Sequence, residues 1–256
     1  MKLLIGGGAL AAIAVAVLTG VLLLGSGDTS LASAGEKLKG QNVRMQIAME
    51  ATMAGAETKM TGTAIQSADS TRVRMETDTT VAGQTQKQTI MVLGKDVFVG
   101  GSDLEAVLPD GKKWLHAEQN LMTGPAAMNF SEYAAFISKA ENISEKGTEQ
   151  IRGQRVTHYG GELNVKEMAD AAKSEDMDRW MKMLDGQVKS FPIEIWVAED
   201  GRPARIALDV AAAGEKMKMT MDILEYGVSL DSVQAPPKAE WITEEELQKQ
   251  LQVSEG

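Results

Sequence analysis

Alternation of apolar and polar residues recurs along most of this chain and restricts what it can fold into. Residues 43–51, VRMQIAMEA, alternate Val, Met, Ile and Met with Arg, Gln, Ala and Glu, and residues 71–77, TRVRMET, follow the same pattern. Successive side chains of a β-strand point to opposite faces of a sheet. These segments therefore predict antiparallel strands with one buried face and one wet face.

Further candidate strands bring the expected total to roughly nine to eleven, which is enough for one large curved sheet. They cover residues 59–66, 87–94, 96–100, 113–118, 142–151, 154–163, 191–198, 202–211 and 216–226. The segments PDGK at 109–112 and EDGR at 199–202 contain Asp-Gly, a pair that favours tight turns. We therefore expect consecutive strands to be neighbours in the sheet.

Three segments have a helical pattern instead. Residues 130–140 carry one apolar stripe, and residues 165–186 place Met177, Trp180, Met181 and Leu184 at helical spacing. In the segment 241–251, Thr243 and Glu246 form a capping box, with Ile242 and Leu247 at the positions of a hydrophobic staple. Strands in sequence with helices inserted between them predict an α+β fold, in which helices pack on one face of an antiparallel sheet.

The N-terminal residues predict export. Lys2 precedes an uncharged apolar run from Leu3 to Gly25, close to the roughly 20 residues that span a bilayer. The run exceeds the core of a cleavable signal peptide, about 7 to 15 residues, which favours a retained membrane anchor with the domain outside. The small residues Ala32–Ala34 nevertheless match a cleavage site, so secretion after cleavage near Ala34 is the alternative.

Composition excludes several classes of function. The formal net charge of −10 makes nucleic acids and anionic membrane surfaces poor partners for the domain itself. The absence of cysteine removes disulfides and thiol chemistry. The two histidines, His116 and His158, have no recognisable catalytic or metal-binding partners, and both are expected to fix strands or to be exposed. We therefore predict no catalytic residues, no metal site and no cofactor.

Methionine is concentrated at inward strand positions. In GEKMKMTMDI, residues 214–223, Met217, Met219 and Met221 fall on one face, while Lys216, Lys218 and Asp222 fall on the other. Flexible thioethers suit either a loosely specified core or an irregular ligand. From composition and periodicity alone, ordinary core is the favoured interpretation of this pattern.

Four segments in order are similar to a known family. Residues 108–118, 147–165, 192–206 and 224–237 resemble the actinobacterial LppX/LprG-type envelope lipoproteins, of the LolA-like lipoprotein-carrier superfamily. The resemblance covers about residues 36–240. It implies a strongly curved antiparallel sheet, a half-barrel, with helices packed on its concave face. Family members hold acyl chains in that apolar cavity. They also carry an acylated lipobox cysteine, which this chain lacks.

The sequence pattern and the resemblance together divide the chain into four parts, and the resemblance implies a non-catalytic role. The parts are an anchor or signal peptide at 1–27, a linker at 28–40, a LolA-like domain at 41–238 and a C-terminal helix and tail at 239–256. The expected ligand is a lipid or acylated amphiphile at the bacterial cell envelope, with the membrane reached through the N-terminal segment and a transport or signalling protein as a further partner. The alternatives are an envelope-stress sensor that detects lipids or lipoproteins, and a structural domain with a filled core.

The expected ligand-facing wall combines the methionine positions with their neighbours. Flexible methionines suit a wall that faces long, featureless acyl chains, so the resemblance shifts the interpretation of these residues from core to cavity lining. The candidate residues are Met45, Ile47, Met49, Val73, Met75, Trp180, Met181, Met217, Met219 and Met221.

Overall fold

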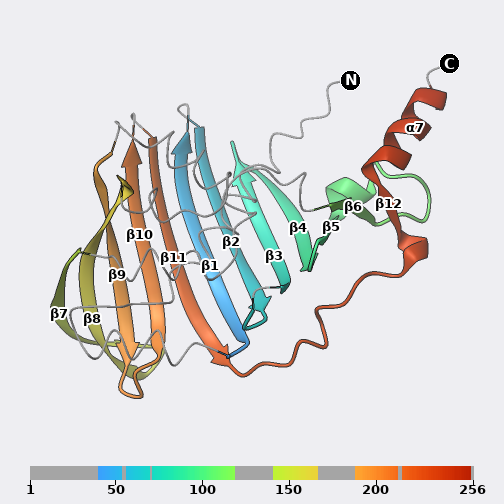
Figure 1. Ribbon diagram of the computed structural model, residues 1–256. Helices are drawn as coiled ribbons and strands as arrows, with labels where there is room; N and C mark the ends of the chain where they lie inside the picture. Colours follow the sequence, from blue (N-terminus) through green and yellow to red (C-terminus); the bar gives the residue numbers. More distant parts are fainter. Residues whose placement is uncertain are drawn as a thin grey trace.

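The computed structural model describes residues 40–53, 56–69, 71–118, 141–166, 188–212 and 215–254. Most of these residues form one broad, open, curved β-sheet (Figure 1). Its strands are β1 (Val43–Met53), β2 (Ala56–Gln66), β3 (Arg72–Val81), β4 (Gln84–Leu93), β5 (Asp96–Gly100), β6 (Trp114–Glu118), β7 (Glu141–Ile151), β8 (Gln154–Asn164), β9 (Ser190–Ala198), β10 (Pro203–Ala212), β11 (Glu215–Tyr226) and β12 (Trp241–Thr243). The helical elements are α3 (Ser102–Glu105), a short 3₁₀ turn at Lys238–Glu240, and α7 (Glu244–Ser254).

The strand order in the sheet is β12-β6-β5-β4-β3-β2-β1-β11-β10-β9-β8-β7. Strands β2 to β6 form one antiparallel meander on one side of β1, and β7 to β11 form a second on its other side. The prediction that consecutive strands are neighbours is confirmed within each meander. It fails between the meanders, because β6 and β7 follow each other in the chain but lie near opposite ends of the sheet. The two meanders are joined instead by the pairing of β1 with β11.

All eleven strands expected from alternation are present, and a twelfth was missed. Strand β12 has only three residues and pairs in parallel with β6. The sequence analysis assigned this segment to the start of a helix. The helix begins immediately afterwards, and its capping box is confirmed: Thr243 N–H donates to Glu246 Oε2 (3.0 Å), and Glu246 N–H donates to Thr243 Oγ1 (3.2 Å).

The two faces of the sheet differ as the alternation predicts. Along β11, Met219 and Met221 are buried, while Lys218 is exposed and forms an ion pair with Asp209 on β10 (3.4 Å). At the β9–β10 turn, Gly201 takes a φ of +79°, which a residue without a side chain adopts at little cost. We call the apolar side the buried face and the charged side the outer face.

Two expectations lie mainly outside the described residues. The helix expected at 130–140 is outside them, and of the one expected at 165–186 only Val165 and Lys166 are described. The chain becomes helical at these two residues, where Lys166 N–H donates to Asn164 Oδ1 (3.0 Å) in the manner of a helix N-cap. The apolar run Leu3–Gly25 is also outside the described residues, and no helix within them is long and apolar enough to cross a membrane.

A segment that we call the strap, residues 227–237, connects β11 to the opposite edge of the sheet along the ends of the central strands (Figure 1). Arg72 Nη2 donates to the carbonyl of Leu230 (3.0 Å) and to that of Val233. Val233 is fully buried. Arg74 reaches the strap through a longer bond to the carbonyl of Ser232 (3.3 Å). Arg72 is therefore the main cation that fixes the strap to β3.

We expect Arg72→Ala to lower the free energy of unfolding by about 2 kcal/mol, because it removes charge-assisted hydrogen bonds to two carbonyls. Arg74→Ala is the matched control, and it should cost about 0.5 kcal/mol because its contacts are exposed. Denaturant titration of both variants measures the difference. Equal losses would show that the strap does not depend on Arg72.

Candidate functional site

The centre of the buried face is formed where β1 pairs with β11. The register places Met49 opposite Met219, Ile47 opposite Met221, and Met45 opposite Ile223. Residues directly opposite each other in a sheet share a face, so these side chains form one continuous apolar surface. The five members of this group that the sequence analysis named are each at most 2% exposed.

The neighbouring strands extend this surface on both sides. Met60 on β2 lies opposite Met49, and Ala64 on β2 lies opposite both Met45 and Met75. On the other side, Leu208 and Ile206 of β10 continue the rows of Met219 and Met221. The buried face thus runs without interruption across at least five strands, and its side chains belong to one hydrophobic cluster.

The structure brings most of the predicted wall together. Met45, Ile47, Met49, Met75, Met219 and Met221 are buried members of the cluster, and Met217 is partly buried against it. Val73 is buried near the start of β3 but is not a member of the cluster. Trp180 and Met181 lie outside the described residues.

Most of this face lies outside the predicted wall. Besides Met60, the cluster includes inward residues of β8 to β10: Tyr159, Leu163, Phe191, Ile193, Ile195, Val197, Ile206, Leu208 and Val210. The same alternation that identified the methionines is present in FPIEIWVA, residues 191–198, so the signal existed in the sequence. These positions were not among the predicted wall residues because the prediction was built around methionine.

The central methionines are almost completely shielded from water, so the buried face is closed to a ligand in this structure. In this structure, the buried face packs as a core packs, out of contact with water. An acyl chain can occupy it only if side chains move apart. Methionine has three rotatable side-chain bonds and adapts to new neighbours more readily than a β-branched residue does. The arrangement therefore fits either a filled core or a binding surface in its empty form.

The two histidines lie on the outer face and have partners there. His116 Nε2 hydrogen-bonds Asp96 (2.8 Å), and its ring stacks on Phe98 with centroids 4.8 Å apart. His158 Nδ1 hydrogen-bonds Glu149 (2.9 Å), and its ring stacks on that of Trp196 (4.2 Å). Both histidines therefore tie adjacent strands together, the structural role that their strand positions favoured.

A bidentate ion pair also lies on the outer face. Arg205 contacts Asp222 through Nε (2.7 Å) and Nη2 (2.9 Å), a bidentate pair between β10 and β11. The hydrogen bonds that Arg205 donates to the Asp222 carboxylate raise the pKa of Arg205, which keeps the guanidinium charged. Within the described part of the chain, no group of three His, Cys, Asp or Glu side chains is placed to hold a metal ion.

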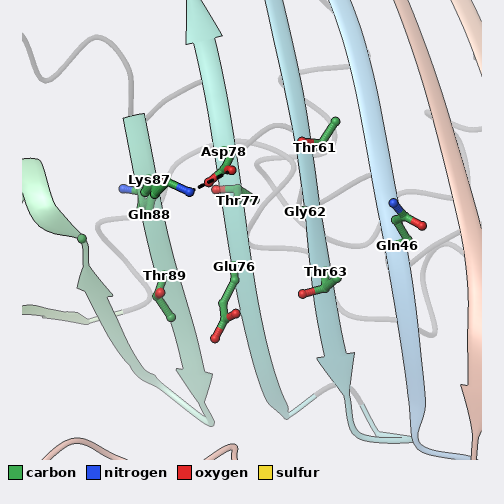
Figure 2. A pocket seen from close by; sticks show the side chains of 11 residues that line it. Gln46, Thr61, Gly62, Thr63, Glu76, Thr77, Asp78, Lys87, Gln88 and Thr89 are labelled. Atoms are coloured by element: carbon green, nitrogen blue, oxygen red, sulfur yellow. Dashed lines mark hydrogen bonds and ion pairs between the residues drawn. The ribbon is translucent and has the colours of Figure 1, made fainter. Parts of the chain in front are cut away.

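A hollow of about 440 Å³ lies over β1 to β4 (Figure 2). Its lining includes Thr61 and Thr63 from β2, and Asp78, which forms an ion pair with Lys87 (3.2 Å). These side chains occupy the exposed positions of their strands, so the hollow opens on the outer face. It is polar, and it lacks the apolar wall that an acyl chain requires.

Comparison with known proteins supports the fold. No protein-family profile matches the sequence, and no curated protein does. Among solved structures, LprF from Mycobacterium bovis is similar over 81% of this chain and 95% of its own, with 11% identity and a TM-score of 0.54. The Mycobacterium tuberculosis lipoprotein LppX is similar over 80% of this chain and 96% of its own, with 14% identity and a TM-score of 0.45.

The MucA/MucB complex of Pseudomonas aeruginosa is a more distant match, with 13% identity, a TM-score of 0.35, and coverage of 81% of this chain and 60% of that chain. The second and third likenesses are too distant to carry an argument. The likeness to LprF shows that this chain shares the fold of that protein, and the open curved sheet agrees with the half-barrel sheet that the resemblance to LppX/LprG-type envelope lipoproteins implied.

Proposed function

We propose that this chain binds the acyl part of a lipid or acylated amphiphile against the buried face, without catalysis, at the bacterial cell envelope. The observation that carries the proposal is the uninterrupted methionine-rich surface across β3, β2, β1, β11 and β10. A surface of this size exceeds what a single apolar ligand group needs, and it suits a long chain. The resemblance to LppX/LprG-type proteins supports the same ligand class.

The methionines at the centre of the buried face favour a ligand-binding surface over a rigid core. Cores that specify one packing arrangement use branched side chains with few rotamers, as β9 and β10 do with Ile193, Ile195 and Ile206. The central strands use methionine at the same inward positions. Methionine is frequent at surfaces that accommodate variable apolar partners. The centre of the face is therefore its most adaptable part.

We propose that the helices expected at 130–140 and 165–186 pack on the concave face and cover it. The second would bring Trp180 and Met181 to the ligand. In the same proposal, residues 41–238 form the binding domain, 28–40 are a tether, and 239–256 are the C-terminal helix and tail. Residues 1–27 would hold the domain at the membrane, facing outside.

The proposal that the chain is not an enzyme is supported by its histidines. Each has a carboxylate partner and a stacked ring on the outer face, opposite the surface proposed for the ligand. An acyl chain on the buried face would be separated from both imidazoles by the thickness of the sheet. Neither histidine is placed to act as a general base on such a ligand.

Lipid extracted from the purified wild-type protein, with thermal melts, tests the binding proposal. We expect wild type to carry lipid, and Met219→Ala to carry less. If the face opens for a ligand, the loss of stability in the empty Met219→Ala protein should fall below the about 2 to 5 kcal/mol of a core truncation. Leu224→Ala, at an exposed position of the same strand, is the control and should change neither property.

Met219→Glu sharpens this test. An unpaired carboxylate in a dry core would prevent folding, whereas one on a surface that opens to a ligand can be hydrated and should only repel acyl chains. We expect a folded, lipid-free variant. The proposal is wrong if wild-type protein never carries lipid and Met219→Ala lowers the free energy of unfolding by as much as a core truncation does. The buried face would then be an ordinary packed core.

Replacing each histidine by Gln should leave lipid binding within about threefold of wild type, roughly 0.65 kcal/mol. The stability of each variant should fall by about 1 kcal/mol, since one hydrogen bond to a carboxylate is weakened. Fluorescent lipid titration and metal analysis of the purified protein measure both properties. Stoichiometric zinc that is lost in either variant would contradict the non-catalytic proposal.

N-terminal sequencing of protein from native membranes tests the anchor. The long apolar run predicts that Leu3–Gly25 is retained in the mature chain. A mature protein that starts at Gly35 would show cleavage after Ala34, and the domain would then be a soluble carrier.

A further inference from the structure

The buried face becomes polar at one end. Thr58 on β2 and Thr77 and Thr79 on β3 are 2%, 3% and 9% exposed. Thr79 lies opposite Met60, and Thr77 lies two positions from Met75 on the same strand. These hydroxyls therefore share the face of the methionines, at the end of the sheet where β3 turns into β4.

The change from apolar to polar occurs at the same level on two adjacent strands, β3 and β4. Along β3, the inward residues run from Met75 to Thr77 and Thr79, and on β4 the residues opposite them are Ile90, Gln88 and Gln86. On β2 the change comes later, because Met60 lies opposite Thr79, and Thr58 lies opposite Val81. The paired polar residues of β3 and β4 therefore form a polar margin of the surface.

The Thr77 hydroxyl has no hydrogen-bond partner within the described structure, although its oxygen is buried. The residue opposite it on β2 is Gly62, which has no side chain to offer. Thr77 also borders the hollow of Figure 2, but the exposed neighbour Glu76 points to that outer face, so alternation turns the Thr77 side chain to the buried face. A buried hydroxyl without a partner is costly and calls for an explanation.

The charge pattern limits what the partner can be. Every acidic and basic residue described on β1 to β5 occupies an outward position of its strand. A phosphate or carboxylate drawn into the buried face here would find no cation among the described residues of β1 to β5, at a large desolvation cost. An ester carbonyl or a hydroxyl group is uncharged and can accept a hydrogen bond from a threonine.

We propose that Thr77, with Thr79 two residues further along β3, is a polar subsite that hydrogen-bonds the ester or hydroxyl group of a neutral acylglycerol-type ligand. This inference rests on the proposed function and adds the orientation of the ligand on the buried face. The ester group lies at the β3–β4 turn end, and the acyl chain extends over Met75, Met45 and the methionines of β11. A ligand with an ester is thereby preferred over a hydrocarbon of the same length.

The test compares two probes on the full-length protein: a pyrene-labelled monoacylglycerol, and a pyrene-labelled alkane of equal chain length. Thr77→Val removes the hydroxyl and keeps the shape of the side chain. It should weaken monoacylglycerol binding about threefold to tenfold and change alkane binding by less than about twofold. Thr77→Ser should restore the wild-type preference. Thr63→Val, on the outer face of β2, is the matched control and should change neither probe.

Thermal melts of the empty protein provide a second readout. Because Thr77→Val removes an unpartnered polar group, its melting temperature should equal or exceed that of wild type. A melting temperature several degrees lower would show that the hydroxyl already has a partner, and would overturn the subsite.

The two proposals fail in different ways. If the wild type binds both probes and Thr77→Val affects them equally or not at all, the subsite is wrong and the proposed function stands. If the wild type binds neither probe, both are wrong.

Discussion

The pairing of β1 with β11 is the interaction on which the rest of this structure depends. It joins residues from opposite ends of the domain, and it connects two meanders that would otherwise be separate sheets. Its register aligns Met49 with Met219 and Ile47 with Met221. A slip of one residue would turn one of these rows to the charged outer face. The continuous apolar surface is therefore a consequence of this one register.

The apolar surface of such an open sheet must be shielded from water, either by other parts of the protein or by a ligand. On the outer face, cross-strand ion pairs and histidine–carboxylate hydrogen bonds link neighbouring strands. The buried Nε2 of His158 has no hydrogen-bond partner there, and a Glu194 carboxylate oxygen lies 3.7 Å from it. The buried face has only apolar contacts over most of its area and unpartnered polarity at Thr77. The proposed ligand, an amphiphile with a neutral polar group, is complementary to both features at once. On one side of a single strand, β3, methionine and threonine lie two residues apart.

Much of the fold could be predicted from the sequence because alternation is a local property. It identified β1 to β11, and capping chemistry identified the start of α7. It could not predict the partner of β1, because pairing between residues 43–52 and 216–226 is not encoded in either segment alone. Nor could it identify β12, whose three residues are too few to show a period. The partners of His116 and the unpartnered hydroxyl of Thr77 depend on which strands lie side by side. They could therefore be recognised only from the arrangement of the sheet.

The most direct measurement of the central claim uses the methionines themselves. Protein produced with a photoreactive methionine analogue in place of its 16 methionines is purified with its native lipid, irradiated and digested for mass spectrometry. Met91 is the internal control, because it is buried on the outer face opposite Arg74 and Phe98. If acyl chains lie on the buried face, we expect lipid adducts at Met49, Met219 and Met221 and none at Met91. Cross-links at the central methionines that join only peptide to peptide would show that the buried face is a filled core.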